Sequence, residues 1–170
     1  MTDNNIFLIG MPGSGKTFWG KKIAQFLGKD FFDLDEEIEK DTQETIIQIF
    51  QSKGEEFFRK KEREVLNKFE NKKNIVLATG GGTPCFLNNM DWLDKQGITI
   101  WIKVPPEILA YRLLEETAQR PLFKDIPHSQ LLPVLQQQMK DRMTYYSKAQ
   151  LHVEGTSISL NEFIKKLKDV

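Results

Sequence analysis

Short apolar runs alternate along this chain with longer segments whose apolar residues recur at helical spacing. Residues 5–9 form the first such run and stop at Gly10, a pattern typical of a strand buried on both faces of a parallel sheet. From Lys16 to Leu27 apolar side chains recur near helical spacing, and Gly28 stands where a helix would end. The chain is therefore expected to open with a strand, a glycine-rich loop and a helix.

The same alternation continues to the C-terminus. Further strands are expected at residues 31–32, 74–78, 98–104 and 149–153. Helices are expected to begin at 33–37 and to cover 45–51, 54–70, 107–115, 129–146 and 160–167. We therefore predict a single α/β domain over residues 1–170, with three layers, a five-stranded parallel sheet flanked by helices, and a mobile lid loop at about 116–127. Ligands of such a sheet gather at the carboxyl ends of its strands.

Composition narrows the classes of partner. An apolar content of 39% excludes general disorder, and no apolar run approaches the roughly 20 residues that span a bilayer. The first residues lack the basic segment of a secretory signal, so we expect a cytoplasmic protein with no membrane partner. Lys plus Arg and Asp plus Glu number 24 each, which gives no electrostatic reason to expect nucleic acid. Cys85 has no second cysteine to pair with, and a monomer is expected.

Residues 10–17 read Gly-Met-Pro-Gly-Ser-Gly-Lys-Thr and match the phosphate-binding pattern G-x-x-x-x-G-K-[ST]. Between a strand and a helix, such a loop surrounds phosphate with backbone N–H groups, and the helix start adds positive potential. Lys16 would then reach the β and γ phosphates of ATP, and the Thr17 hydroxyl could bind Mg²⁺. Nucleotide contacts are thus expected at Gly13, Ser14, Gly15, Lys16 and Thr17. The motif does not specify the reaction, because GTPases, motors and switches also carry it.

Two carboxylates, Asp33 and Asp35, follow the second expected strand. Alternation would send them to opposite sides unless the chain turns into a helix between them. One could then hold Mg²⁺ while the other orients or deprotonates an attacking hydroxyl, because phosphoryl transfer needs both a metal and a positioned nucleophile. The simpler interpretation is that an acidic helix start only complements the helix dipole.

Other candidate ligand-binding groups follow later in the chain. Arg59 could bind a carboxylate through two hydrogen bonds, although with Glu62 three residues later it could equally form a solvated ion pair. Three glycines at 80–82 after a strand invite close approach of a ligand. Arg120 lies in the polar loop and could close over the transferring phosphates, or be a plain exposed arginine. Arg142, on the later helix, could face the same pocket or pack along the helix surface.

In combination these segments resemble the shikimate kinases, small P-loop kinases similar in fold to the nucleoside monophosphate kinases. The resemblance spans nearly the whole chain and rests on residues 10–17, 31–39, 58–62, 80–82 and 120–122. It implies that Thr17 and Asp33 serve Mg²⁺, that Lys16 stabilises phosphate, and that Asp35 contacts the acceptor hydroxyl as candidate base. It also implies a lid arginine near the phosphates at Arg120, and shikimate contacts at Arg59, Gly80, Gly81, Gly82 and Arg142.

The function this predicts is Mg²⁺-dependent transfer of the ATP γ-phosphate to the 3-hydroxyl of shikimate, a step of aromatic amino acid biosynthesis. One alternative is a gluconate kinase or another small-metabolite P-loop kinase, whose acceptor would leave the paired arginines and the glycine triplet unexplained. A second is a nucleotide-binding switch without an acceptor; GTPase switches normally carry N-K-x-D, and residues 67–70 lack the aspartate. Many relatives flank adenine with a basic residue and a proline after the last strand, and residues 154–158 contain neither.

Overall fold

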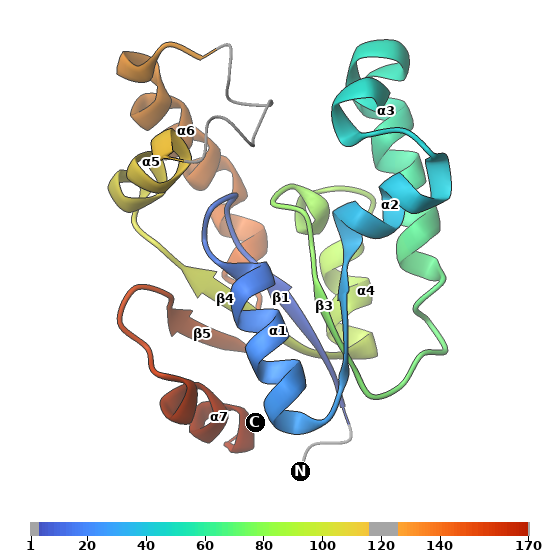
Figure 1. The fold of residues 1–170 in the computed structure, drawn as a ribbon, viewed down its shortest axis with the longest axis vertical. Coiled ribbons are helices and arrows are strands. Elements are labelled where there is room, and N and C mark those ends of the chain that lie inside the picture. The colour runs from blue at the N-terminus through green and yellow to red at the C-terminus, as the bar shows by residue number, and fades with distance from the viewer. Residues whose placement is uncertain (1–3, 116–125, 170) are drawn as a thin grey trace.

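The computed structural model describes residues 4–115 and 126–169. Figure 1 shows a central sheet with helices around it. The strands are β1 (Asn5–Ile9), β2 (Asp30–Asp33), β3 (Ile75–Ala78), β4 (Gly97–Lys103) and β5 (Leu151–Glu154). The helices in the described part are α1 (Lys16–Leu27), α2 (Leu34–Thr42), α3 (Ile46–Asn67), the short 3₁₀ turn η1 (Thr83–Cys85), α4 (Asn89–Gln96), α5 (Pro106–Glu115), α6 (His128–Tyr146) and α7 (Leu160–Lys168). The five strands run parallel in the order β2-β3-β1-β4-β5, which confirms the predicted α/β fold.

Helices cover both faces of the sheet, which is why β1 and β3 are buried along their whole length. Phe7 of β1 packs its ring against Trp92 of α4, with the ring centroids 6.2 Å apart. The next residue, Leu8, lies beside Gly20 of α1. Because successive side chains of a strand point to opposite faces, α1 and α4 belong to opposite layers.

Several element ends lie where the sequence signals placed them. Helix α1 starts after Gly15 and ends at Gly28, whose φ of 65° is in the left-handed region and whose N–H bonds the Ala24 carbonyl. Helix α3 is interrupted at Gly54, with φ 80° and ψ 174°, inside the region where two separate helical segments were expected. A residue with a side chain would be strained at that φ, so the glycine allows the change of direction.

The sequence patterns missed η1 and α4, which fill the connection between β3 and β4. Helix α4 is only eight residues long, and its buried residues are Asn89, Met90 and Leu93. Its apolar residues are Met90, Trp92 and Leu93, which are too few to establish a helical period. The residue before it, Asn88, has a φ of 55° and gives no side-chain cap, so the usual start signal is also missing.

The strand order determines where a ligand can bind. After β1 the chain moves to β2 on one side of the sheet, and after β3 it crosses to β4 on the other side of β1. The loops that follow β1 and β3 therefore lie next to each other at a point where the winding direction changes, and α/β sheets bind ligands in the crevice at such points. Within the described ranges, no helix combines the length and the apolar character that crossing a membrane requires.

Candidate active site

The loop between β1 and α1 is built on three glycines with positive φ, namely Gly10 (147°), Gly13 (79°) and Gly15 (91°). A Cβ atom at Gly10 would also lie 2.8 Å from the Ile102 carbonyl oxygen, so the loop admits no side chain there. The Lys16 ammonium group donates hydrogen bonds to two carbonyl oxygens of the same loop, at 2.8 and 2.9 Å. The loop thus has the tight turns of a phosphate cradle, with its cation held inside the turn.

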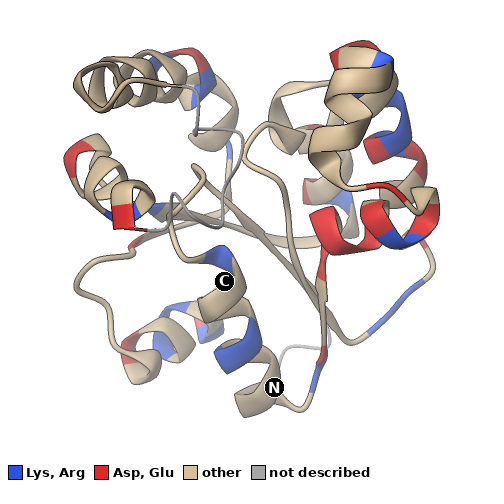
Figure 2. Ribbon diagram, turned by 45° about the horizontal axis from the view of Figure 1, so that its top comes forward, with Lys and Arg blue, Asp and Glu red and all other residues tan. Residues whose placement is uncertain are grey.

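Asp33 ends β2, and the chain turns at once into α2. Its Oδ1 accepts a hydrogen bond from the backbone N–H of Asp35 at 3.1 Å and so caps the helix. Its Oδ2 accepts a hydrogen bond from the Thr17 hydroxyl at 2.7 Å. Figure 2 shows the acidic start of α2 beside the end of β2. Helix capping therefore describes Asp33 correctly, and the same side chain also brings a carboxylate to the hydroxyl of the phosphate loop.

Asp35 lies in the first turn of α2, partly buried in the wall of the cleft. Its pKa is raised from 3.8 to about 6, chiefly because burial withdraws water from the carboxylate. The negative charges of Asp33 and Glu62 raise this pKa further, and the positive charge of Lys16 lowers it. A carboxylate with a pKa near neutrality is a stronger proton acceptor than an ordinary aspartate, as a general base requires.

Arg59 on α3 forms a partly buried ion pair. Its Nη1 donates to Glu62 at 3.1 Å, its Nη2 donates to the exposed Glu55 at 3.1 Å, and its guanidinium lies 4.1 Å from the centre of the Phe86 ring. Glu62 is fully buried and also accepts a 2.6 Å hydrogen bond from the Thr83 hydroxyl. Burial raises the pKa of Glu62, whereas the charge of Arg59 lowers it. The interpretation of Arg59 and Glu62 as a solvated pair is therefore wrong.

The glycine triplet after β3 is required by the side chains that approach it. A Cβ at Gly82 would lie 2.5 Å from Nη2 of Arg59, and one at Gly81 would lie 3.0 Å from Nη1 of Arg142. A Cβ at Gly80 would lie 3.0 Å from Oδ1 of Asp35. None of the three has a φ in the left-handed region, so close packing and not backbone conformation explains the glycines. The triplet brings both arginines and the candidate base to one short loop.

Arg142 projects from α6 toward the loop after β1, where its Nη1 lies 3.7 Å from the Met11 sulfur. Tyr146, one helical turn later, is fully buried and donates a hydrogen bond to the Gly81 carbonyl at 2.5 Å. Of the two arrangements open from the sequence, the one in which Arg142 faces the pocket is therefore correct. Tyr146, in contrast, does not line the pocket.

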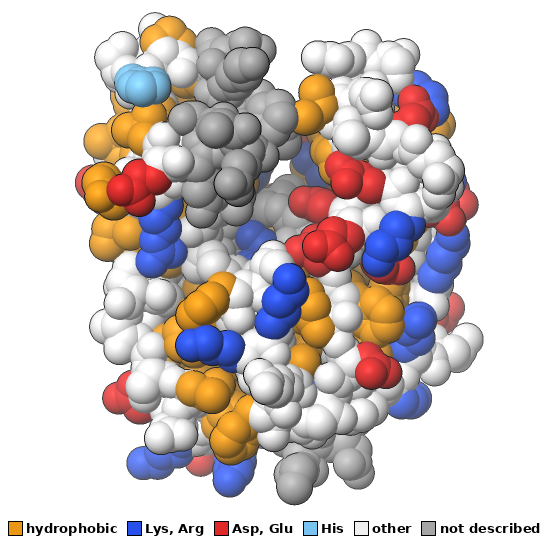
Figure 3. All heavy atoms as spheres, in the orientation of Figure 1, with side chains coloured by type: hydrophobic (Ala, Val, Ile, Leu, Met, Phe, Trp, Pro, Cys, Tyr) orange, Lys and Arg blue, Asp and Glu red, His pale blue; other side chains and the backbone are white. Residues whose placement is uncertain are grey.

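Most of the predicted site residues line one cleft of about 980 Å³. Figure 1 shows α3 opposite α5 and α6, and Figure 3 shows that the surface is hollowed on this face of the molecule. From the predicted set it includes Gly13, Ser14, Gly15, Lys16, Thr17, Asp33, Asp35, Arg59, Gly80, Gly81, Gly82 and Arg142. Arg120 and residues 116–125 of the predicted lid lie outside the described residues.

The cleft also contains residues that the sequence patterns did not single out. Arg112 of α5 donates a hydrogen bond to the Gly13 carbonyl at 3.0 Å. Gln138, one turn before Arg142 on α6, has its buried Oε1 without a hydrogen-bond partner in the described part of the chain. An arginine or a glutamine on an amphipathic helix carries no local signal of such a position. The apolar part of the wall includes Ile46, Ile47, Phe50 and Phe58.

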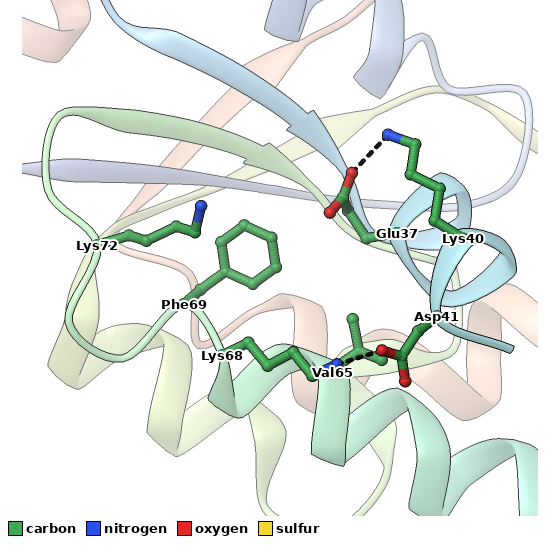
Figure 4. Close-up of a pocket in the computed structure, with 7 residues that line it drawn as sticks. All are labelled: Glu37, Lys40, Asp41, Val65, Lys68, Phe69 and Lys72. Carbon is green, nitrogen blue, oxygen red and sulfur yellow. Dashed lines mark hydrogen bonds and ion pairs between the residues drawn. The ribbon is translucent and has the colours of Figure 1, made fainter.

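A second hollow, of about 290 Å³, lies between α2 and the end of α3. Figure 4 shows Lys40 directed at Glu37 and Lys68 directed at Asp41. Lys72 lies 4.5 Å from the centre of the Phe32 ring. Lys40 and Lys68 are thus paired with carboxylates of the protein itself, and the hollow shares none of the candidate site residues.

Comparison with known proteins agrees with this geometry. The family model described as shikimate kinase matches residues 12–170. The shikimate kinase of Phocaeicola vulgatus is 39% identical over 144 residues, which cover 85% of this chain and 82% of the relative. The crystal structure of shikimate kinase from Bacteroides thetaiotaomicron superposes with a TM-score of 0.91 at 32% identity, covering 99% and 98% of the two chains. The structure of shikimate kinase from Acinetobacter baumannii in complex with shikimate superposes with a TM-score of 0.87 at 34% identity. The match covers 99% of this chain and 92% of the other. The chain belongs to the shikimate kinase family.

Proposed function

We propose that this chain transfers the γ-phosphoryl group of ATP to the 3-hydroxyl of shikimate, giving shikimate 3-phosphate and ADP. The observation that carries the proposal is that one cleft joins the phosphate loop to a raised-pKa carboxylate and two arginines. In the reaction, the oxygen of the 3-hydroxyl forms a bond to the γ-phosphorus while the bond from that phosphorus to the β–γ bridging oxygen breaks. The hydroxyl proton goes to Asp35 and the electron pair stays on ADP.

The donor side depends on the loop before α1. Backbone N–H groups at the start of a helix and the positive end of its dipole stabilise phosphate oxygens. The Lys16 ammonium group donates hydrogen bonds to two loop carbonyl oxygens, at 2.8 and 2.9 Å. It is therefore already placed beside the site where phosphate would bind. Phosphoryl transfer relies mainly on such positioning and charge stabilisation, and a fixed cation reduces the reorganisation that the reaction needs.

The oxygens of Thr17 and Asp33 fit a magnesium ion. They lie 2.7 Å apart at the end of the phosphate loop, and Mg²⁺ prefers one or two such oxygen ligands together with water and substrate phosphates. Among the described residues, no group of three or more His, Cys, Asp or Glu side chains is placed to hold a metal ion, so the phosphates and water would have to complete the coordination. Bound there, Mg²⁺ would neutralise negative charge on the β and γ phosphates.

The acceptor side depends on Asp35, Arg59 and Arg142. Asp35 can accept a hydrogen bond from the acceptor hydroxyl and then take its proton, because its pKa of about 6 leaves it mainly ionised at neutral pH. The two guanidinium groups approach the same glycine triplet from α3 and α6. They could hold the carboxylate of shikimate between them through charge-assisted hydrogen bonds.

A cytoplasmic location and a monomeric state remain predictions from the sequence.

The proposal is tested by measuring ADP release with shikimate, with gluconate and without an acceptor. We expect turnover that requires both Mg²⁺ and shikimate, and a product whose phosphate is attached at the 3-position by phosphorus-coupled NMR. Turnover with gluconate instead would indicate a sugar-acid kinase. Turnover independent of any acceptor would indicate a nucleotide switch, and either result would overturn the proposed function.

A further inference from the structure

Helix α6 contacts the phosphate loop through a side chain that no step of the transfer uses. The hydroxyl of the fully buried Tyr146 donates to the Gly81 carbonyl at 2.5 Å and lies 3.8 Å from the sulfur of Met11. Nη1 of Arg142, one turn earlier, lies 3.7 Å from the same sulfur. Two residues of α6 thus meet one residue of the phosphate loop.

The backbone of Met11 is part of the phosphate loop, whereas its side chain contacts Arg142 and Tyr146 of α6. Its carbonyl oxygen accepts hydrogen bonds from the Lys16 ammonium group at 2.9 Å and from the Ser14 backbone N–H at 3.1 Å. Its side chain is almost fully buried against Arg142 and Tyr146. Packed protein interiors transmit small displacements because they contain little free volume. A shift of α6 would therefore move the backbone that shapes the phosphate loop.

The glycine triplet completes this contact. A Cβ at Gly81 would lie 2.7 Å from Cδ of Pro12 and 3.0 Å from Nη1 of Arg142, so the phosphate loop, the triplet and α6 touch one another at this residue. The Tyr146 hydroxyl has one proton, and its short bond to the Gly81 carbonyl holds that peptide in one orientation. The ring of Tyr146 packs on Trp101 of β4, with centroids 5.6 Å apart, which anchors the hydroxyl to the sheet.

We propose that Tyr146 is a positioning residue that couples the donor and acceptor halves of the site through Gly81 and Met11. This inference rests on the proposed function. In-line transfer requires the reacting atoms to be held about 3–3.5 Å apart, so the phosphate loop and the acceptor loop must keep a fixed separation. Tyr146 supplies that constraint without touching either substrate. If one loop is ordered by its ligand, the other binds its own ligand more tightly, and the coupling is the same in both directions.

The test compares Tyr146→Phe with wild type and with Tyr145→Phe. Tyr145 is the adjacent, partly exposed tyrosine, and its replacement removes a hydroxyl from the same helix without touching Gly81. Calorimetry measures shikimate affinity with and without saturating Mg·ADP, and steady-state kinetics measure kcat and both KM values. For Tyr146→Phe we expect kcat/KM to fall about 10-fold for shikimate at saturating ATP and for ATP at saturating shikimate, because the coupling is reciprocal. The affinity of each ligand measured alone should stay within about 2-fold of wild type. We also expect the effect of Mg·ADP on shikimate affinity to be lost, and wild-type values for Tyr145→Phe.

Two further outcomes would overturn the inference. Unchanged kinetics and coupling in Tyr146→Phe would show that the hydroxyl only satisfies a buried carbonyl. Weaker binding of each ligand measured alone, in step with a lower melting temperature, would show a general packing defect. Met11→Leu, which keeps most of the side-chain volume, gives a second measurement if Tyr146→Phe does not fold, and it must weaken the same coupling. Wild-type protein without shikimate-dependent turnover would instead refute the proposed function, and this inference with it.

Discussion

Replacing the candidate base with its amide should remove activity and, at neutral pH, increase stability. The Asp35 pKa rises from 3.8 to about 6 on folding, a rise of about 2, and each unit corresponds to 1.36 kcal/mol, so the ionised carboxylate costs up to about 3 kcal/mol. Asp35 is only partly buried, and water in the cleft screens part of this cost. Asparagine also gives up about 0.5 kcal/mol of favourable charge at the helix start. We therefore expect Asp35→Asn to raise the free energy of unfolding by about 1–2 kcal/mol at pH 7.5.

The stability gain of Asp35→Asn should depend on pH, because burial raises the pKa of the wild-type carboxyl group. Because the folded state holds the proton more tightly, it binds more protons than the unfolded state between pH 3.8 and about 6. The cost of the ionised Asp35 is therefore absent below that window, grows as pH rises through it, and is complete above it. The stability difference between Asp35→Asn and wild type should shrink toward zero by about pH 4.

Urea denaturation of both proteins at several pH values measures this difference, with Glu36→Gln as the control. Glu36 is the next residue of the same helical turn but is exposed, so its replacement should change stability by no more than about 0.5 kcal/mol at any pH. In the kinase assay Asp35→Asn should lose at least about 100-fold in kcat, and wild-type kcat/KM should fall below about pH 6 as the base becomes protonated. A variant that is less stable than wild type at pH 7.5, or that keeps its activity, would refute the reasoning.

Four further substitutions test separate parts of the site and fold. Lys16→Ala should remove at least about 100-fold of the transfer rate with any acceptor, because the phosphates lose their fixed cation; near-normal turnover would contradict the phosphate-loop assignment. Arg59→Ala should weaken shikimate binding by about 2–5 kcal/mol in calorimetry while ATP binding is retained, and unchanged affinity would exclude Arg59 from the site. Gly82→Ala should raise KM for shikimate about 10-fold or more, since its Cβ would lie 2.5 Å from Arg59; an unchanged KM would show that the arginine can move away freely. Gly20→Ala should cost about 1–3 kcal/mol in urea denaturation, because its Cβ would lie 2.3 Å from the Phe31 ring, with kcat per folded molecule preserved; a stable variant would mean that the ring repacks.

The fold was predictable because its signals are local. A fully buried parallel strand is a nearly continuous apolar run, as residues 6–9 and 75–78 show, and glycines mark the loops that follow both of them. Helix α4 was not predictable, because it is short, its apolar residues are only Met90, Trp92 and Leu93, and no capping side chain marks its start. Its existence depends on packing against the sheet, as the contact between Phe7 and Trp92 illustrates.

The sequence alone determined the phosphate loop, because its glycines and lysine all lie within residues 10–16 and each conformation required there is a property of one residue. Tertiary structure alone decided how the acceptor side is assembled. Arg59 and Arg142 are 83 positions apart in the sequence. They come together only because two helices far apart in the sequence, α3 and α6, reach the same glycine triplet. The raised pKa of Asp35 likewise arises from burial and from neighbouring carboxylates that folding brings close. Local conformation can be predicted from neighbouring residues. The distances between side chains from distant segments, and the loss of water around a buried carboxylate, are set only when the chain folds.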